Sequence, residues 1–323
     1  MNSPEISVTS GIVPHALTAM PSLIEAVFPA QKVSFEAQAE RTGVQSQTLT
    51  GLGSYWKGRK PLILVRALIL GMLLPQTEDR EADLEVYEKL LAFDDEGLAR
   101  RAAANDSLKL TDIAASISLN NPNDYFVARS SGQSANDGDL AYWTFPIDCD
   151  ALGIKLRWKR DITIEGKLEI YRLVIKNLGT YEEKASICKR PEEVDADFLY
   201  EPVWDTVNKH YGHLGVQAYS FESLVEQLGI LRYGHRPRVG DTFAGGGSIP
   251  FEAARIGCDS YGSDLNPIAC MLSWAGAKII GASSENRAII NKAQKLLANE
   301  VDAEITKLGI EHDKHGNRAK AYL

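Results

Sequence analysis

Residues 238–267 contain the groups whose types and spacing best suit the binding of a small polar ligand. The segment RVGDTFAGGGSIPFEAARIGCDSYGSDLNP predicts a strand, a glycine turn, a helix and a second strand that ends in an acid. A helix start leaves backbone N–H groups unpaired, and glycines at 245–247 keep side chains out of the way of a polar or anionic group. We expect Ser248 to cap the helix and Pro250 to lie in its first turn.

The same segment narrows the class of ligand. The dinucleotide fingerprint G-x-G-x-x-G requires glycine where this chain has Pro250, and no Gly-Lys-Ser/Thr follows as in a phosphate loop. Asp264 ends the second strand 23 residues after Asp241, near the spacing at which an acid accepts hydrogen bonds from both ribose hydroxyls. S-adenosylmethionine satisfies these constraints, with its ribose at Asp264 and its aminoacyl end near the glycine turn. The alternative is a tight strand-to-helix connection with a capping aspartate.

The surrounding patterns predict the elements that would position these residues. Residues 236–323 begin as strand, helix, strand and helix, which indicates the start of an α/β sheet. Residues 21–104 carry apolar side chains at helical spacing. Between them, β-branched and aromatic segments between turn-rich loops predict hairpin strands in YFVARS, LAYWTFPID, IKLRWKR and KLEIYRLVI. Helices are expected to begin near Pro202 and, in SFESLVEQLG, to follow Ser220 as cap and end at the terminal glycine.

The glycine segment resembles the cofactor segment of DNA amino-methyltransferases, whose turn reads D-P-F-x-G-x-G. Within that class the chain most resembles the family of domain of unknown function 1156 (DUF1156), which is found fused to such methyltransferases and often near anti-phage defence genes. Further segments resemble that family in the same order, excepting roughly 105–180; they include SLIEAVFPAQKVSFEAQAERTG, YWKGRKPLILVRALILGMLLP and CKRPEEVDADFLYEPVWDTVNKHYG. The turn residues that carry the likeness, with threonine at the usual proline, are Asp241, Thr242, Phe243, Ala244, Gly245, Gly246 and Gly247.

The resemblance implies an α/β fold: an incomplete Rossmann-like methyltransferase sheet that binds S-adenosylmethionine, preceded by a helical module and a mixed α+β insertion. The expected divisions are an amino-terminal arm (1–20), a helical DUF1156-like module (21–104), an insertion with connecting helices (105–235) and the cofactor-binding Rossmann-like start (236–323).

The resemblance also implies cofactor-binding residues beyond the glycine turn. These are Asp264, Leu265, Asn266 and Pro267, of which the last two would wall the adenine. GRKPLILVRALI resembles the K-P-x-x-L-x-x-x-L-I helix of amino-methyltransferases, so Lys60 and Pro61 would lie near the methionine end of the cofactor. The alternative is an ordinary amphipathic helix with a basic, proline-marked start.

The catalytic loop of this class, D/N/S-P-P-Y/F/W, is missing, because no two prolines of the sequence are adjacent. Residues 268–323 read mostly as helix and supply no further strands. We therefore assign no catalytic residue and expect no methyl transfer by this sequence alone. Three explanations for the missing loop remain open. Either a second polypeptide carries the catalytic half of a split enzyme, or the sequence is a truncated product, or the fold is reused for binding alone. The rival functions are a non-catalytic subunit of a defence system that binds DNA or a partner, and a small-molecule methyltransferase.

DNA is the expected macromolecular partner. KLRWKR places Lys155 and Arg157 on one face of a candidate strand and Trp158 on the other, an arrangement that combines phosphate contacts with a stacking ring. Protection of an edge strand by basic residues is the alternative. A second candidate site adjoins the proposed cofactor helix and consists of Trp56, Lys57 and Arg59.

Composition limits the remaining possibilities. A net charge of −8 argues against non-specific coating of nucleic acid, although a local basic channel is compatible with it. Four scattered cysteines fit a reducing compartment, and neither they nor His210 and His213 form a metal motif. The sequence has neither a sustained apolar run nor a signal peptide, so we expect a cytoplasmic protein without a membrane partner.

Overall fold

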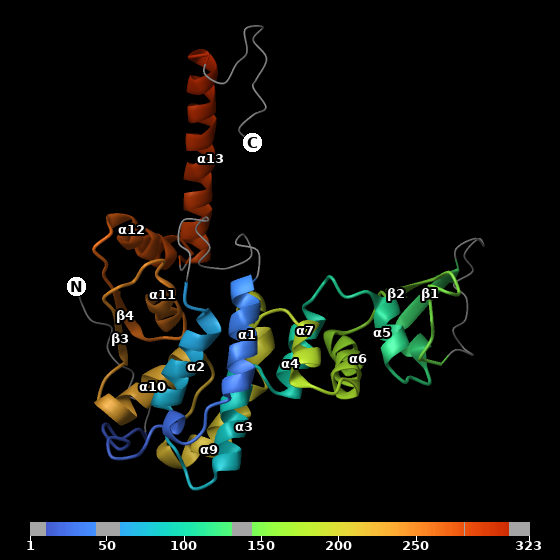
Figure 1. The fold of residues 1–323 in the computed structure, drawn as a ribbon, viewed down its shortest axis with the longest axis horizontal. Coiled ribbons are helices and arrows are strands. Elements are labelled where there is room, and N and C mark those ends of the chain that lie inside the picture. Colours follow the sequence, from blue (N-terminus) through green and yellow to red (C-terminus); the bar gives the residue numbers. More distant parts are fainter. Residues whose placement is uncertain (1–10, 43–58, 131–143, 281, 310–323) are drawn as a thin grey trace.

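The structure, a computed structural model, describes residues 11–42, 59–130, 144–280 and 282–309 (Figure 1). The fold is mixed α/β and 59% helical, and the described residues form two small two-stranded sheets. Helices therefore supply most of the packing that holds the short strands in place.

The amino-terminal part is mainly helical, as predicted, in the described portion of residues 21–104. Its second long helix, LILVRALILGML, is apolar on nearly every side, and most of its residues are buried, whereas Leu68 and Met72 are exposed. Leu62 and Leu70 of this helix are completely buried. The elements are η1 (Leu23–Glu25), α1 (Ala30–Thr42), α2 (Leu62–Leu73), α3 (Arg80–Leu91) and α4 (Asp95–Ala103).

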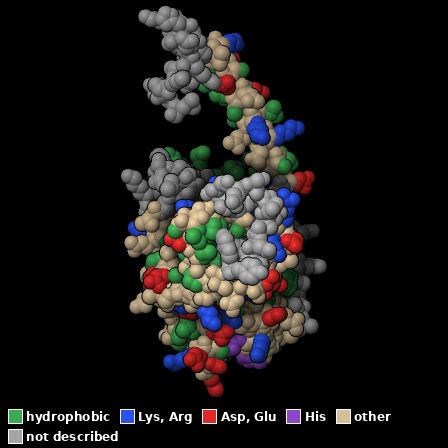
Figure 2. All heavy atoms as spheres, turned by 90° about the vertical axis from the view of Figure 1, so that its right-hand side faces the viewer, with side chains coloured by type: hydrophobic (Ala, Val, Ile, Leu, Met, Phe, Trp, Pro, Cys, Tyr) green, Lys and Arg blue, Asp and Glu red, His purple; other side chains and the backbone are tan. Residues whose placement is uncertain are grey.

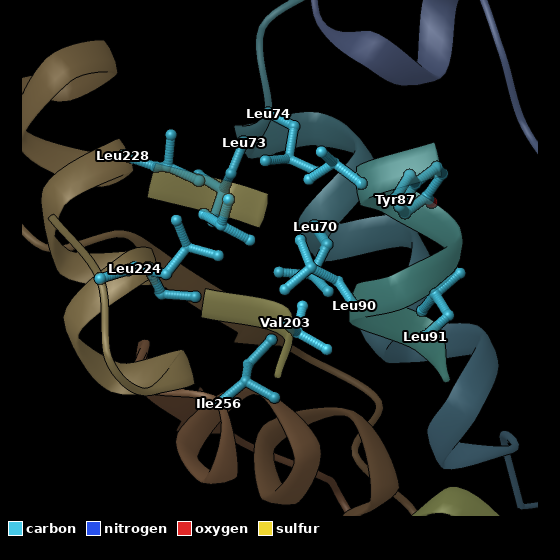
Figure 3. Close-up of a cluster of buried hydrophobic side chains, with 14 of the residues drawn as sticks. Leu70, Leu73, Leu74, Tyr87, Leu90, Leu91, Val203, Leu224, Leu228 and Ile256 are labelled. Carbon is cyan, nitrogen blue, oxygen red and sulfur yellow. The ribbon is translucent and has the colours of Figure 1, made fainter. Parts of the chain in front are cut away.

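Later helices complete the same hydrophobic core. Figure 3 shows Leu70, Leu90, Val203, Leu224 and Ile256 converging from separate segments of the chain. Truncation of such a buried leucine to alanine costs about 2–5 kcal/mol, so this core is what fixes the relative positions of the helices. The added elements are η4 (Pro191–Glu193), α8 (Ala196–Tyr200), α9 (Val203–Tyr211), η5 (Gly212–Leu214) and α10 (Phe221–Tyr233).

The start of α10 follows the prediction and its end does not. The Ser220 hydroxyl accepts the N–H of Ser223 at 3.1 Å and caps the helix. The helix then passes through Gly229, the expected terminus, and ends at Gly234, where φ is +75°. Gly229 serves close packing instead, because a Cβ there would lie 2.3 Å from Cδ of Pro237.

A second hydrophobic cluster lies in the middle of the chain, beside α4. Its strands β1 and β2 pair antiparallel with Phe126 opposite Trp158, which confirms the strands predicted in YFVARS and IKLRWKR. The elements are α5 (Leu110–Ser116), η3 (Pro122–Asp124), β1 (Phe126–Ser130), β2 (Ile154–Trp158), α6 (Ile164–Asn177) and α7 (Tyr181–Ser186).

One of the predicted hairpin strands is wrong, and a second does not form in its described part. KLEIYRLVI lies inside α6, where Leu168, Tyr171 and Ile175 share one buried face at helical spacing. The Thr163 hydroxyl caps this helix by accepting the N–H of Gly166, which is a helix-start signal that the strand prediction missed. In the described part of LAYWTFPID, only an isolated bridge from Phe145 to Leu119 forms.

The carboxyl-terminal part contains the predicted strand–helix–strand unit. β3 and β4 pair in parallel, with Asp241 opposite Gly262, and the intervening helix crosses over between them. The predicted helix PIACMLSWAGAKII is present, but it changes to a π-helix after Ala275. The elements are β3 (Arg238–Asp241), α11 (Ser248–Arg255), β4 (Asp259–Gly262), α12 (Pro267–Ala275), the π-helix η6 (Gly276–Ile280) and α13 (Ser284–Lys307).

Helix α13 projects away from the body of the molecule (Figure 1). Figure 2 shows hydrophobic side chains among charged ones along it, and Leu296, Leu297 and Val301 are roughly half exposed. Within the described residues, the main packing contact of α13 is at its base, against η6.

Candidate cofactor site

Asp264 lies directly against the glycine turn. The N–H of Gly245 donates to Oδ2 of Asp264 at 2.9 Å, and the N–H of Asn266 donates to Oδ1 at 2.9 Å. Parallel pairing of β3 with β4 brings the carboxyl ends of both strands to one edge, where the turn and the acid meet. The structure therefore brings together the two features that the sequence singled out.

The carboxylate of Asp264 is held in its ionised form. Hydrogen bonds from the backbone N–H groups of Asn266 and Gly245 lower its pKa. A carboxylate offers about four lone-pair positions, of which these two bonds occupy two. Asp264 is only half-buried, so the remaining positions are available to hydroxyl donors of a ligand.

The glycine turn depends on Gly247. Its φ is +76°, and a Cβ at this position would lie 2.7 Å from Oγ and 2.8 Å from Cα of Ser273 in α12. Gly247, rather than Ser248, is the N-cap of α11, which corrects the expected serine cap. The hydroxyl of Ser248 is instead buried without a hydrogen-bond partner among the described residues, as is that of Ser273.

A pocket of about 230 Å³ opens on the turn. Lys60 lines it together with Asp241, so the predicted cofactor helix does begin beside the glycine turn. Pro61 is the N-cap of α2 and lines a neighbouring pocket. The complete lining is Arg59, Lys60, Asp241, Phe243, Ala244, Gly245, Gly246, Ser248 and Ile249.

Apart from Ala244, the other predicted cofactor residues do not line this pocket; they are Thr242, Gly247, Asp264, Leu265, Asn266 and Pro267. Ala244 is buried and accepts the N–H of Gly247 at 2.7 Å, while Thr242 is exposed. Asn266 caps α12 through its side chain, and Pro267 is the first residue of that helix. Two large apolar side chains are open to solvent: Phe243, which lines the pocket, is 81% exposed, and Leu265, which follows Asp264, is 97% exposed. Both offer apolar surface to whatever covers the site.

Residues 27–90 match the family model described as "Protein of unknown function (DUF1156)". This match supports the DUF1156 resemblance. It covers α1 and α2 and nearly all of α3, including Lys60 and Pro61, and it ends well before the glycine turn. No curated protein and no solved structure matches the chain.

Residues 27–90, called here the DUF1156 segment, contact α11, the helix after the glycine turn, through a buried ion pair. This pair was not predicted from the sequence. Arg66 of α2 contacts Glu252 of α11 at 2.7 Å and the Tyr200 hydroxyl at 2.6 Å. Arg255 adds a second ion pair to Glu252 at 2.7 Å. The only signal in the sequence is that Arg66 is the one charged residue in the apolar run LILVRALILGML.

A buried acid of the DUF1156 segment supports the start of α2. Glu40 accepts the N–H of Leu62 at 2.7 Å and is 8% exposed. Burial, and then the neighbouring charge of Glu192, raise the pKa of the Glu40 carboxyl to about 7. The Glu40 carboxyl therefore gains or loses its proton near neutral pH. This change takes place next to the start of α2, which Lys60 precedes.

The predicted nucleic-acid residues have separate surroundings. Lys155 and Arg157 are exposed on one face of β2, whereas Trp158 stacks on Phe126 with ring centroids 4.6 Å apart. Trp158 thus belongs to the second hydrophobic cluster, and packing inside the protein accounts for its place in the strand. Arg59 lines the pocket at the glycine turn. Trp56 and Lys57 lie outside the described residues.

The histidine pair has structural roles. His210 contacts Asp83 at 2.7 Å, and the ring of His213 contacts the carbonyl of His210 at 2.9 Å. Among the described residues there is no group of three histidine, cysteine, aspartate or glutamate side chains suited to a metal ion. No described helix is long and apolar enough to cross a membrane.

Proposed function

We propose that this chain is the S-adenosylmethionine-binding, amino-terminal portion of a DNA amino-methyltransferase that modifies adenine N6 or cytosine N4. The observation that carries the proposal is the contact between Asp264 and the N–H of Gly245 at the carboxyl edge of two parallel strands. In α/β sheets this edge is where nucleotide-like ligands bind.

The residues present fit such a cofactor. Asp264 would accept the ribose hydroxyls, and the buried hydroxyl of Ser248, which lacks a partner among the described residues, is a polar group at the turn that a ligand can satisfy. Lys60 lies at the same pocket and would meet the carboxylate of the methionine moiety. When bound, S-adenosylmethionine supplies an activated methyl group for a base amine.

The described pocket provides only part of a complete site. Its volume of about 230 Å³ is below the roughly 300–1,000 Å³ of typical small-molecule sites. Along β4 and α12, Tyr261, Met271 and Trp274 are 61–69% exposed, and exposed apolar patches mark surfaces that other protein covers. We propose that protein outside this sequence, in the same polypeptide or a second one, covers this face and supplies the catalytic loop.

Isothermal titration calorimetry with S-adenosylmethionine tests the proposal. Asp264→Ala should weaken binding by about tenfold or more, because hydrogen bonds to a charged group contribute about 1.5–3 kcal/mol. Asp259→Ala is the matched control, since Asp259 begins β4 and Asp264 lies just beyond the other end of that strand. Equal affinities of the wild type and Asp264→Ala would refute the cofactor site.

The expected lack of catalysis requires a separate assay. The purified chain, a DNA duplex and S-adenosylmethionine labelled in its methyl group should yield no labelled DNA. Label recovered in the DNA would show that this chain alone is a complete enzyme.

A non-catalytic subunit that binds DNA or a protein partner is the second candidate function. The exposed apolar side chains on β4 and α12 favour a protein contact at that face. DNA binding by the chain without measurable affinity for S-adenosylmethionine would favour this candidate over the first.

A further inference from the structure

A second pocket lies beside the glycine-turn pocket, between α1 and the start of α2. Its volume is about 700 Å³, and Arg59 and Lys60 line both pockets. The two spaces are therefore neighbours on the same surface. The complete lining of the second pocket, called here the α1–α2 pocket, is Ser34, Ala37, Gln38, Arg41, Thr42, Arg59, Lys60, Pro61 and Leu64.

The charge of the α1–α2 pocket is entirely positive among its lining residues. Three of them are cationic, Arg41, Arg59 and Lys60, and none is acidic. Neither Arg41 nor Lys60 forms an ion pair with another residue in the part of the chain that the structure describes. In a protein with a net charge of −8, such a group of cations marks a surface that attracts anions.

The two faces of α1 carry opposite charges, which explains why the charged residues that line the pocket are all cations. Its acids Glu36 and Glu40 lie four residues apart on the inward face, where both are buried. Glu36 pairs with Arg101 at 2.7 Å, and Glu40 accepts the N–H of Leu62. The helix therefore turns its carboxylates inward and directs Arg41 to the pocket, so its own acids do not neutralise the pocket.

We propose that the α1–α2 pocket binds a phosphate group of the DNA backbone and thereby places the strand next to the cofactor site. The inference rests on the proposed function for the choice of DNA as the polyanion. The physical basis is the three cations, together with the polar side chains of Ser34 and Gln38, which supply hydrogen bonds of the kind that position a phosphate without reading sequence.

Fluorescence anisotropy with a labelled DNA duplex and with the same single strand tests this assignment. Arg41→Gln should weaken binding about fivefold and reduce the slope of log K against log salt by about 1, as expected for one lost phosphate contact. Arg80→Gln is the matched control: it removes one exposed charge beyond the far end of α2, a helix of 12 residues and thus about 18 Å long.

Competition separates a backbone phosphate from a free one. Inorganic phosphate should displace the labelled DNA only at concentrations where its ionic strength alone weakens binding. Unlabelled DNA should displace the labelled DNA at low concentration. Equal DNA affinities of Arg41→Gln and Arg80→Gln would overturn the assignment. Tight binding of inorganic phosphate that Arg41→Gln abolishes, with DNA binding unchanged, would also overturn it in favour of a free-phosphate site.

Calorimetry with S-adenosylmethionine on Arg41→Gln keeps the two proposals apart. Arg41 does not line the glycine-turn pocket, so its replacement should leave cofactor affinity unchanged. If the wild type does not bind S-adenosylmethionine, the cofactor proposal is refuted. If Arg41→Gln nevertheless binds DNA more weakly than that wild type, the phosphate site is supported.

Discussion

Nε of Arg66 lies 2.7 Å from Oε1 of Glu252, and both side chains are at most 4% exposed. The pair joins α2 of the DUF1156 segment to α11, the helix that begins at the glycine turn. Two buried charges require excellent geometry to offset their loss of hydration. Here the guanidinium also contacts Tyr200, and Arg255 adds a second cation to the carboxylate.

Breaking this pair should be strongly destabilising. Arg66→Met leaves the Glu252 carboxylate buried with Arg255 as its remaining cation, and we expect a loss of about 3–5 kcal/mol in the free energy of unfolding. Glu252→Gln should also destabilise the protein. Urea denaturation of both single variants and the double variant checks this expectation. The double variant should lose less than the sum of the two, and strictly additive losses would contradict a coupled pair.

Stability should fall as pH rises through neutrality because of Glu40. Its pKa is raised from 4.5 to about 7 in the folded protein. The folded state therefore binds more protons than the unfolded state between these values, so stability is highest at the acidic end of the interval. The shift corresponds to about 3 kcal/mol lost by the time pH exceeds the folded pKa.

Glu40→Gln should remove this pH dependence. The amide keeps an acceptor for the N–H of Leu62 and carries no charge, so we expect a gain of about 1–3 kcal/mol at pH 8 and little change near pH 4.5. Chemical denaturation at both pH values measures it. Glu78→Gln, at an exposed position before α3, is the control and should change neither value. A gain that is the same at both pH values would assign the effect to packing.

Trp158 should behave as a core residue. Its ring lies 4.6 Å from that of Phe126 in a stacked cross-strand pair. Trp158→Ala should cost about 1–3 kcal/mol, because its ring is partly buried against the second hydrophobic cluster. Arg157→Ala, on the exposed face of the same strand, should change stability by less than about 0.5 kcal/mol. Thermal unfolding followed by near-ultraviolet circular dichroism distinguishes them. A stable Trp158→Ala variant with weakened DNA binding would restore the stacking role predicted from the sequence.

Features set by neighbouring residues were predictable, and features set by distant ones were not. The glycine turn and Asp264 belong to one strand–helix–strand unit, so their spacing was sufficient to place them together. The Arg66–Glu252 pair joins residues 186 positions apart, and no local pattern specifies that contact. Likewise, nothing within α10 indicates that Gly229 packs against Pro237 rather than ending the helix.

The error at α6 has a different physical origin. Its β-branched and aromatic residues favour strands when each is considered alone. Thr163 caps the segment, and buried positions such as Leu168 and Ile175 recur at the helical period. Tertiary packing on one face therefore decides the structure against residue preference.

Gly247 and Gly240 provide a matched test of the glycine turn. Gly247→Ala forces a residue with φ of +76° to carry a Cβ that would lie 2.8 Å from Cα of Ser273, so α12 must shift away from the turn. Because a strained backbone position costs about 1–3 kcal/mol, we expect a measurable fall in melting temperature and weaker binding of S-adenosylmethionine. Gly240→Ala, in β3, meets nothing within 4 Å and should be neutral or slightly stabilising. If both variants bind the cofactor as the wild type does, the closeness of α12 to the turn has no part in binding.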